Sequence, residues 1–512
     1  MNSGENHSSG FVLLTGSTGL LGRQLLADFL RCHIPIVVLV RPAEGMSASA
    51  RIEHIVAGIE QQASRRFVRP VVLSGNLLDE NLGLSQEQQQ WLQRHCRYVV
   101  HSAANLSFRP AAEHPDNEPL RTNIDGTANL VEICGRLGIR QFHYVSTAYV
   151  CGVLNGAAAM EAAPTRSTTF ANDYERSKAE AECLLHECRE LDQLTVYRPS
   201  IIVAPKTNTA VGTDQAIATA YSTYELLASR FGLPKPGDWL RNLGLNGTER
   251  KNIVSADWVS RMIVQIFRHP ELHGNTYHLT NENGTQVKSL DKGFRRSVLA
   301  AHPQIKQAHA NTDLQLLETL ARPYVATFLP YFRDDPQFDR TNLMFALSRC
   351  NEHDAGAITA EEICRLTTIQ PESTKDSFTT LPSVTAWSTF VTQHQSWTDS
   401  EPETGADSFG LILTGPLGGT WTIGICSDRV SITPGVSVFT TRRLYATTDN
   451  WSNLLKSETS VQNAMIIGQL LIECDDDSPT THQWVIESLE QLKRATLRSG
   501  TLQTYLGVAN VR

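Results

Sequence analysis

The stretch FVLLTGSTGLLGRQLLADFL, residues 11–30, decides the fold. Its first five residues form an apolar run that ends at a glycine, which predicts a buried strand at Phe11–Thr15. A helix is predicted at Leu21–Cys32, because apolar residues recur there at helical spacing: Leu21, Leu25, Leu26 and Phe29. A glycine-rich turn directly between a strand and a helix is the context of a dinucleotide-binding fingerprint.

The alternation of apolar runs and amphipathic segments continues outward to about residue 280. Further strands are predicted at Ile36–Val40, Val71–Ser74, Tyr98–His101, Gln141–Ser146, Leu194–Tyr197 and Thr276–Leu279. Strands that alternate with helices form parallel sheets covered on both faces. The sequence therefore predicts an α/β fold with a Rossmann-type doubly wound parallel sheet over residues 11–289, after a disordered N-terminus at 1–10.

The remaining chain is predicted to form two further parts. Residues 290–383 indicate a helical extension and linker, because helical patterns there give way to a Ser/Thr/Pro-rich segment. Residues 384–512 indicate a smaller α+β domain after that. Its predicted elements are a helix at Val384–Trp397, strands at 409–415, 419–426, 429–435 and 442–448, and a helix at Thr481–Leu497.

Composition excludes several classes of protein. The chain has 512 residues, 41% hydrophobic and 19% charged, which excludes wholesale disorder and a fibrous repeat. Its formal charge of −8 argues against a nucleic-acid partner. We expect a cytoplasmic protein without a transmembrane segment, because neither a secretory signal nor a bilayer-length apolar stretch is visible. The ten cysteines are scattered without zinc spacing, which predicts reduced thiols and no metal site.

The glycine turn TGSTGLLG, residues 15–22, is predicted to hold the cofactor pyrophosphate. Gly16 would permit the tight turn, Gly19 would admit the phosphates to the backbone N–H groups, and Gly22 would let the helix pack closely. The helix N-terminus stabilises the same phosphates. The predicted contacts are Gly16, Ser17, Thr18, Gly19, Leu20, Leu21, Gly22 and Arg23, the last of which could equally be a solvated helix residue.

The end of the second strand indicates which cofactor binds. An NAD enzyme commonly places an acid there for the ribose 2′-hydroxyl, whereas this chain has Val40-Arg41-Pro42. A guanidinium can pair bidentately with a 2′-phosphate. Arg41 therefore favours NADPH over NADH.

A candidate catalytic group is the pair Tyr174 and Lys178, four residues apart on one face of a predicted helix. The ammonium of Lys178 is expected to lower the pKa of the phenol and to hold the cofactor ribose, so that Tyr174 donates a proton to a developing alkoxide. A surface tyrosine beside a solvated lysine is the alternative. Thr147, at the carboxyl end of the fifth strand, is the predicted partner of the substrate oxygen, while Ser146 faces the core.

Residues 11–285 resemble the extended short-chain dehydrogenase/reductase family. The resemblance rests on motifs that occur in order: TGSTGLLG at 15–22, GNL at 75–77, HSAA at 101–104, NIDGT at 123–127, VST at 145–147, YERSK at 174–178 and YRPSIIV at 197–203. It implies further cofactor contacts at Asn76, Leu77, Ala103, Ala104, Pro199, Ser200, Ile201 and Ile202. The family usually has Asp at the position of Asn76, which leaves the adenine contact open. Asn123 is a weaker candidate for ordering the site, with a structural role as the alternative.

Three segments resemble the thioester reductase and fatty acyl-CoA reductase branch of that family: 101–108, 252–267 and 274–281. This resemblance implies hydride delivery from NADPH to an acyl thioester on coenzyme A or an acyl carrier protein, with an aldehyde or alcohol as product. A homodimer through the helices near 122–138 and 174–190 follows only by analogy. Two alternatives remain open: a ketone or alcohol oxidoreductase acting on a lipid-like or secondary metabolite, and a non-catalytic lipid or cofactor sensor.

Residues 384–510 resemble the sterol carrier protein 2-like domain, on the segments 419–435 and 442–476 and the terminal helix. The resemblance implies a lipid-like ligand in an apolar interior. Candidate lining residues are Leu444, Trp451, Leu455, Met465, Ile466 and Leu470, which could equally fill an ordinary core.

Overall fold

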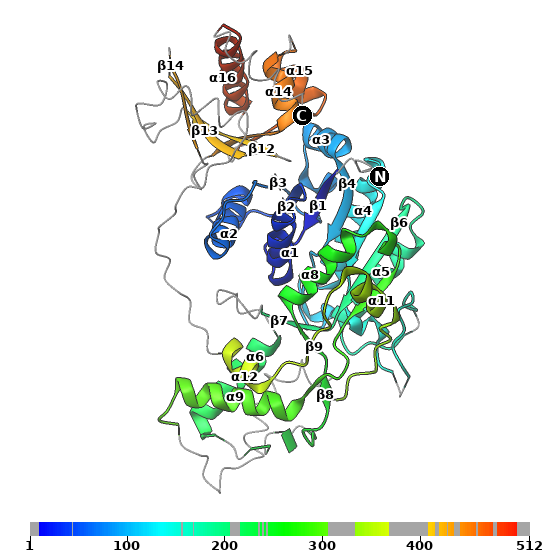
Figure 1. Cartoon of the computed structure of the whole chain (residues 1–512). Helices are drawn as coiled ribbons and strands as arrows, with labels where there is room; N and C mark the ends of the chain where they lie inside the picture. Colours follow the sequence, from blue (N-terminus) through cyan, green and yellow to red (C-terminus); the bar gives the residue numbers. More distant parts are fainter. Residues whose placement is uncertain are drawn as a thin grey trace.

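The computed structural model describes residues 10–43, 45–154, 157–166, 168–204, 216–233, 236–237, 240–241, 244–305, 333–367, 408–414, 419–426, 429–434, 441–456, 459–474 and 479–498. The predicted N-terminal segment, apart from Gly10, and the predicted helix Val384–Trp397 lie outside these residues. In Figure 1 the chain runs from a central sheet, through helices that pack beside it, to a smaller second sheet.

Seven parallel strands form the central sheet in the order β10-β6-β5-β4-β1-β2-β3. Their bounds are β1 Phe11–Thr15, β2 Ile36–Val40, β3 Val71–Ser74, β4 Cys96–His101, β5 Gln141–Val145, β6 Gln193–Pro199 and β10 Thr276–Leu279. All seven are predicted strands, and no end is displaced by more than two residues. The predicted Rossmann-type doubly wound sheet is therefore confirmed.

The strand order reverses at β1, which pairs with β2 on one side and with β4 on the other. Ligands of open α/β sheets bind at such a switch point, beyond the carboxyl ends of the strands. Thr15 and His101 are paired in register at these ends, so they mark the floor of the crevice.

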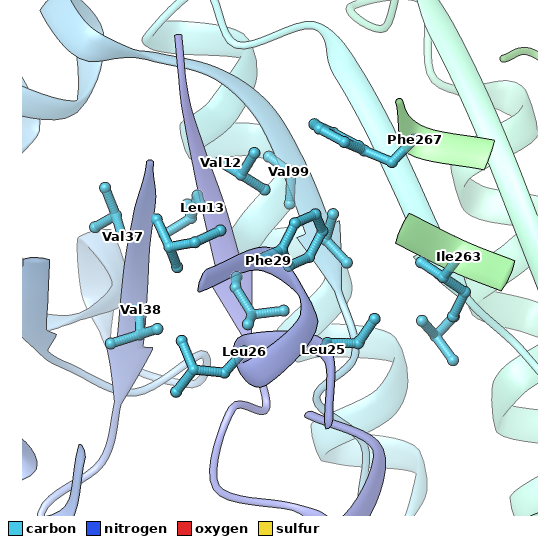
Figure 2. Packing of buried hydrophobic residues seen from close by; sticks show 14 of the residues in the cluster. Val12, Leu13, Leu25, Leu26, Phe29, Val37, Val38, Val99, Ile263 and Phe267 are labelled. Carbon is cyan, nitrogen blue, oxygen red and sulfur yellow. The ribbon is translucent and has the colours of Figure 1, made fainter. Parts of the chain in front are cut away.

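Helices cover the sheet and supply most of its core. They are α1 Leu20–Arg31, α2 Ala48–Ala63, α3 Gln86–His95, α4 Gly126–Arg136, α5 Asp173–Glu187 and α8 Ala256–Phe267. Figure 2 shows Leu25, Leu26 and Phe29 of α1 between the strands and α8. The rings of Phe29 and Phe267 meet edge to face, with centroids 5.4 Å apart. This contact holds α1, and with it the glycine turn, against the sheet.

The chain after β6 adds short strands and further helices before it returns to the core. Its elements are β7 Ile201–Val203, α6 Ala216–Phe231, β8 Arg250–Lys251, β9 Ile253–Ser255, β11 Thr285–Gln286, α9 Val287–Ala301, α11 Thr341–Cys350 and α12 Ala360–Thr367. β7 pairs with β9 in a separate parallel ribbon, and β8 pairs with β11. The predicted boundary at residue 289 falls inside α9. Leu343 and Leu347 of α11 are buried in the same core as the central sheet, so α11 packs as part of it.

The C-terminal unit is a mixed five-stranded sheet in the order β14-β13-β12-β15-β16. Its elements are β12 Ser408–Thr414, β13 Gly419–Cys426, β14 Arg429–Pro434, β15 Arg442–Thr447, α14 Thr448–Lys456, α15 Val461–Ile466, β16 Leu470–Cys474 and α16 Pro479–Arg498. The three helices pack on one face. Five of the six proposed lining residues are buried in this core, whereas Ile466 is 56% exposed, so its prediction as a lining residue is wrong.

Candidate active site

The glycine turn has the backbone that close phosphate approach requires. Gly16 lies at φ +75°, and a Cβ added there would lie 2.6 Å from the amide nitrogen of Ala103. A Cβ on Gly22 would lie 1.9 Å from the carbonyl oxygen of Gly16, so helix α1 begins tightly against the turn. The N-cap residue Gly19 supplies no side-chain cap. The N–H groups of the first turn of α1 are thus available to an anion.

Ser17 supports the fit of a dinucleotide to this turn. Its side chain is 1% exposed, and its hydroxyl has no hydrogen-bond partner among the described residues. A buried hydroxyl without a partner carries a desolvation cost that a bound phosphate oxygen would offset. Residues 16–22 therefore fit the pyrophosphate of a nicotinamide dinucleotide.

Three arginines gather at the end of β2, where the sequence predicts only two. Arg23 donates to the carbonyl of Thr18 at 2.9 Å, and Arg51 of α2 donates to the carbonyl of Arg41. Burial lowers the pKa of Arg51, and the charges of Arg41 and Arg23 lower it further. Arg51 was missed because it lies eleven residues beyond the strand end, yet it stands in the first turn of the following helix. We call Arg23, Arg41 and Arg51 the arginine cluster.

The side chain of Asn76 forms hydrogen bonds within its own loop. Its amide donates to Asp79 at 3.3 Å, and its carbonyl oxygen accepts from the backbone of Leu78 at 3.4 Å. Leu77 is buried beside Gly126. Ala103 donates its backbone N–H to Thr15 and packs against Gly16, which places residues 102–103 along the glycine turn.

Helix α5 carries Tyr174 and Lys178, and Lys178 reaches the end of β5. The side chain of Asn172 caps this helix by accepting from the backbone of Glu175 at 2.9 Å. The ammonium of Lys178 donates to the carbonyl of Val145 at 2.7 Å and lies 4.1 Å from the centroid of the Tyr144 ring. Lys178 is thereby held against the end of β5.

The expected lowering of the Tyr174 pKa is wrong for this structure. Burial raises the pKa of the phenol well above its usual value, and Glu175 raises it further. Burial also lowers the pKa of Lys178 to about 7, against the opposing effect of Glu182. Desolvation is the largest cause of both shifts. A phenol that keeps its proton suits Tyr174 as a general acid.

Ser146 and Thr147 face opposite ways at the end of β5. Ser146 donates its hydroxyl to Glu182 at 2.6 Å. The hydroxyl of Thr147 lies 3.5 Å from the carbonyl of Pro199, at the end of the neighbouring strand β6, and accepts from the backbone of Tyr149. The structure thus places Thr147, Pro199 and Lys178 at the carboxyl ends of β5 and β6.

A buried carboxylate that sequence reasoning missed supports these strand ends. Glu182 is fully buried on α5, four residues after Lys178, and forms an ion pair with Arg198 of β6. Arg198 also contacts His278 of β10 at 3.3 Å. The charged pair lowers the pKa of Glu182 despite its burial. Two signals in the sequence could have predicted this pair. Arg198 is a charged residue inside the apolar run YRPSIIV, and Glu182 is an acid at helical spacing from Lys178.

Asn123 and His101 form buried hydrogen bonds near the carboxyl ends of the strands. Asn123 exchanges hydrogen bonds with the backbone of Asn105 and donates to the hydroxyl of Ser177 at 2.8 Å. His101 lies between the hydroxyls of Thr15 and Thr127, at 2.7 and 3.0 Å. Burial lowers the pKa of His101 to about 3, with a contribution from Lys178. Asn123 therefore orders the loop beside α5, and His101 is a neutral member of the floor.

The segment 333–339 contacts residues that follow β5 and residues of β8. Tyr149 donates to Asp335 at 2.9 Å, and the same carboxylate pairs with Lys251. Ser200 donates to Asn252 at 2.8 Å, while Ile201 and Ile202 lie in β7. The chain that follows residue 332 thus contacts Tyr149, two residues after Thr147.

Comparison with known proteins agrees with this architecture. A model of the NAD-binding family described as "Male sterility protein" matches residues 14–263. The chain is 32% identical over 211 residues to "Isonitrile lipopeptide synthase" of Mycobacterium tuberculosis, covering 38% of this chain and 8% of the relative. It is 23% identical over 224 residues to "Fatty acyl-CoA reductase wat" of Drosophila melanogaster, covering 38% and 43%. The chain therefore spans less than half of each of these relatives.

Among solved structures, the terminal R domain from the myxalamid PKS-NRPS biosynthetic pathway has a TM-score of 0.54 at 22% identity, covering 71% of this chain and 90% of that domain. This likeness shows the fold.

No helix in the described ranges has the length and apolar character to cross a bilayer. The family match and the glycine turn together support a domain that binds a nicotinamide dinucleotide.

Proposed function

We propose that this protein is an NADPH-dependent reductase of acyl thioesters. The observation that carries the proposal is the position of Thr147 and Lys178 at neighbouring strand ends, with Tyr174 one helical turn before Lys178 on α5, in a chain whose glycine turn fits a dinucleotide. The relatives named a lipopeptide synthase and a fatty acyl-CoA reductase support an acyl group as substrate. The carrier in this proposal is coenzyme A or the phosphopantetheine of a carrier protein.

The arginine cluster supports NADPH over NADH. Its guanidinium groups lie at the end of β2 and the first turn of α2, where the ribose 2′-position of a bound dinucleotide is expected. Burial lowers the pKa of Arg51 and the charges of Arg41 and Arg23 lower it further, so a negative charge at this position would stabilise the cluster. A 2′-phosphate would supply that negative charge and accept several hydrogen bonds.

The chain's own residues supply the proton and the oxyanion contacts. Bound NADPH supplies a hydride to the carbonyl carbon of the thioester. Tyr174 donates its retained proton toward the carbonyl oxygen, and Thr147 donates a hydrogen bond to the same atom. Lys178, fixed by the Val145 carbonyl, holds positive charge beside the developing oxyanion. The resulting thiohemiacetal breaks its C–S bond and passes its hydroxyl proton to the departing sulfur, which gives the aldehyde and a free thiol, and a second round of reduction gives the alcohol.

The C-terminal unit is proposed to be a sterol-carrier-like domain. Its five-stranded sheet with helices on one face supports this architecture. The proposed lining residues Trp451 and Leu470 are buried within a packed core, which favours a structural role for them in this state over an open lipid cavity.

The test follows NADPH absorbance and free thiol together while the full chain is offered medium- and long-chain acyl thioesters. Thioester reduction predicts coupled NADPH loss and thiol release, and Tyr174→Phe should reduce both by about 10²- to 10⁴-fold. NADPH loss without thiol release, on a ketone or aldehyde, would replace the proposal with the ketone or alcohol oxidoreductase alternative.

A further inference from the structure

The middle of the C-terminal sheet is apolar on both faces, and Arg443 and Glu473 flank it on the outer side. Along β12, β15 and β16, alternate residues point into the core under the helices: Leu411, Leu413, Leu444, Ala446, Leu470 and Ile472. The residues between them, Ile412, Tyr445 and Leu471, are each at most 3% exposed and belong to the core of the central sheet. We call these three the outer face. A sheet with one solvated face would carry polar residues there, so the outer face is built to be covered.

Helix α3 of the nucleotide-binding half covers part of this surface. Gln88 donates to Glu473 of β16 at 2.5 Å, and Arg94 donates to the carbonyl of Ile467 at 2.9 Å. The ring of His95 shares a hydrogen bond with the carbonyl of Gly468 at 2.7 Å. A Cβ added to Gly468, at φ +70°, would lie 3.1 Å from the carbonyl of Gln90. The two backbones therefore approach closely along α3, which contacts β16 and α15. Figure 1 shows α3 below the helices of the C-terminal unit.

Tyr445 extends the contact to the elements that carry the cofactor site. Its phenol lies beside the hydroxyl of Ser49 on α2 and the backbone of Val72 on β3, and burial raises its pKa well above the usual value. Ser49 precedes Arg51 of the arginine cluster by two residues. β3 ends at Ser74, directly before Gly75-Asn76. The outer face thus packs against α2 and β3, close to Arg51 on α2 and to Asn76 after β3.

We propose that the C-terminal unit is a structural brace of the nucleotide-binding half. It docks through its outer face onto α2, β3 and α3, and thereby holds the first turn of α2 in the position that brings Arg51 to Arg41. Cofactor binding is then coupled to docking, because only the docked state presents the arginine cluster preformed. The identity of the cofactor in this inference rests on the proposed function.

Two sets of variants of the full chain test the brace from opposite sides. Tyr445→Ala with Leu471→Ala removes apolar contacts of the outer face, and Gln88→Ala with Arg94→Ala removes the polar contacts from α3. Asn453→Ala, on the exposed side of α14, is the matched control. The readouts are amide hydrogen exchange over α2, β3 and α3, and the Kd for NADPH and NADH. Trp451, buried in the inner core, reports by fluorescence whether the C-terminal unit stays folded.

Both interface variants are expected to raise hydrogen exchange in the first turn of α2 and in α3 by about tenfold or more, and to weaken NADPH more than NADH. Loss of Trp451 burial together with this increase also supports the brace, since the two units then unfold as one. Exchange and NADPH affinity equal to those of Asn453→Ala would overturn it. If neither dinucleotide binds any form while exchange still rises, the proposed cofactor fails and the brace stands.

Discussion

The hydroxyl of Ser146 donates to the buried carboxylate of Glu182 over 2.6 Å, and the next residue, Thr147, consequently faces the opposite side of the strand end. Because successive strand residues alternate, anchoring the first determines where the second points. Glu182 also lies one helical turn beyond Lys178 on α5. One carboxylate therefore positions Thr147 and supports the charge of Lys178.

Glu182→Gln is expected to shift the alkaline limb of the pH profile of NADPH-dependent turnover to lower pH. Burial holds the pKa of Lys178 at about 7, and Glu182 opposes that effect, so loss of its charge lowers the lysine pKa further. Lys178 also lies 4.1 Å from the centroid of the Tyr144 ring, and its charge contributes to the lowered pKa of His101. The variant also leaves Arg198 without its charge partner, which should cost about 3–5 kcal/mol of stability.

Glu180→Gln is the matched control for this experiment. Glu180 lies on the same helix, with its side chain 39% exposed, and approaches Arg176 at only 4.0 Å. Its profile should match that of the unmodified protein. A Glu182→Gln enzyme that is less stable but keeps an unchanged alkaline limb would show that Glu182 acts through folding alone.

Arg51→Ala is expected to raise the KM for NADPH by about 10- to 100-fold, the loss of one or two charge-assisted hydrogen bonds, while the KM for NADH changes little. The comparison variant is Arg31→Ala, which removes an exposed arginine at the end of α1 that pairs with Asp28. Steady-state kinetics with both cofactors measures the ratio. Equal losses for NADPH and NADH would place Arg51 outside the 2′-phosphate site.

Gly22→Ala is expected to abolish dinucleotide binding and to lower the melting temperature. Its Cβ would lie 1.9 Å from the Gly16 carbonyl, so either the turn or the start of α1 must move. Gly58→Ala, in the middle of α2 with nothing within 4 Å of the added Cβ, should instead stabilise the protein by about 0.4–1 kcal/mol. Thermal unfolding and dinucleotide titration of the two variants measure both effects.

The protein is expected to lose stability in acid because His101 is buried as the neutral form. Its pKa is lowered to about 3 in the folded chain, so below an ordinary value of about 6.5 the unfolded chain binds the proton first. The free energy of unfolding should then fall by about 1.4 kcal/mol per pH unit for each such histidine. Burial also lowers the pKa of His278, to about 4, so it contributes to the same slope. Denaturant unfolding between pH 7 and pH 5 measures it, and His101→Gln should make the slope shallower.

The sequence was sufficient for the central sheet because its strands are continuous apolar runs, as at Ile36–Val40. It was insufficient for β16. Leu470, Leu471 and Ile472 face two different cores, so the run lacks the alternation of a half-buried strand, and it follows a helical segment. Burial on both faces is a tertiary property that single-strand patterns do not record.

The candidate site shows the same division. Gly16, Gly22 and Lys178 were located because each belongs to a short motif whose spacing carries the chemistry. The pairing of Glu182 with Arg198, the position of Arg51 beside Arg41, and the contact of Asp335 with Tyr149 join residues that are distant in sequence or lie in different elements. The direction of the Tyr174 pKa also depends on burial, which the spacing of the motif does not record.

The most direct test of the central claim follows the hydride itself. The full chain is incubated with an acyl thioester and NADPH carrying deuterium at the transferred position of the nicotinamide, and the products are analysed by mass spectrometry beside a thiol assay. The account predicts deuterium on the former carbonyl carbon, one atom in an aldehyde or two in an alcohol, with one free thiol released per acyl group. An unlabelled acyl product, or label transfer that Tyr174→Phe leaves at full rate, would contradict it.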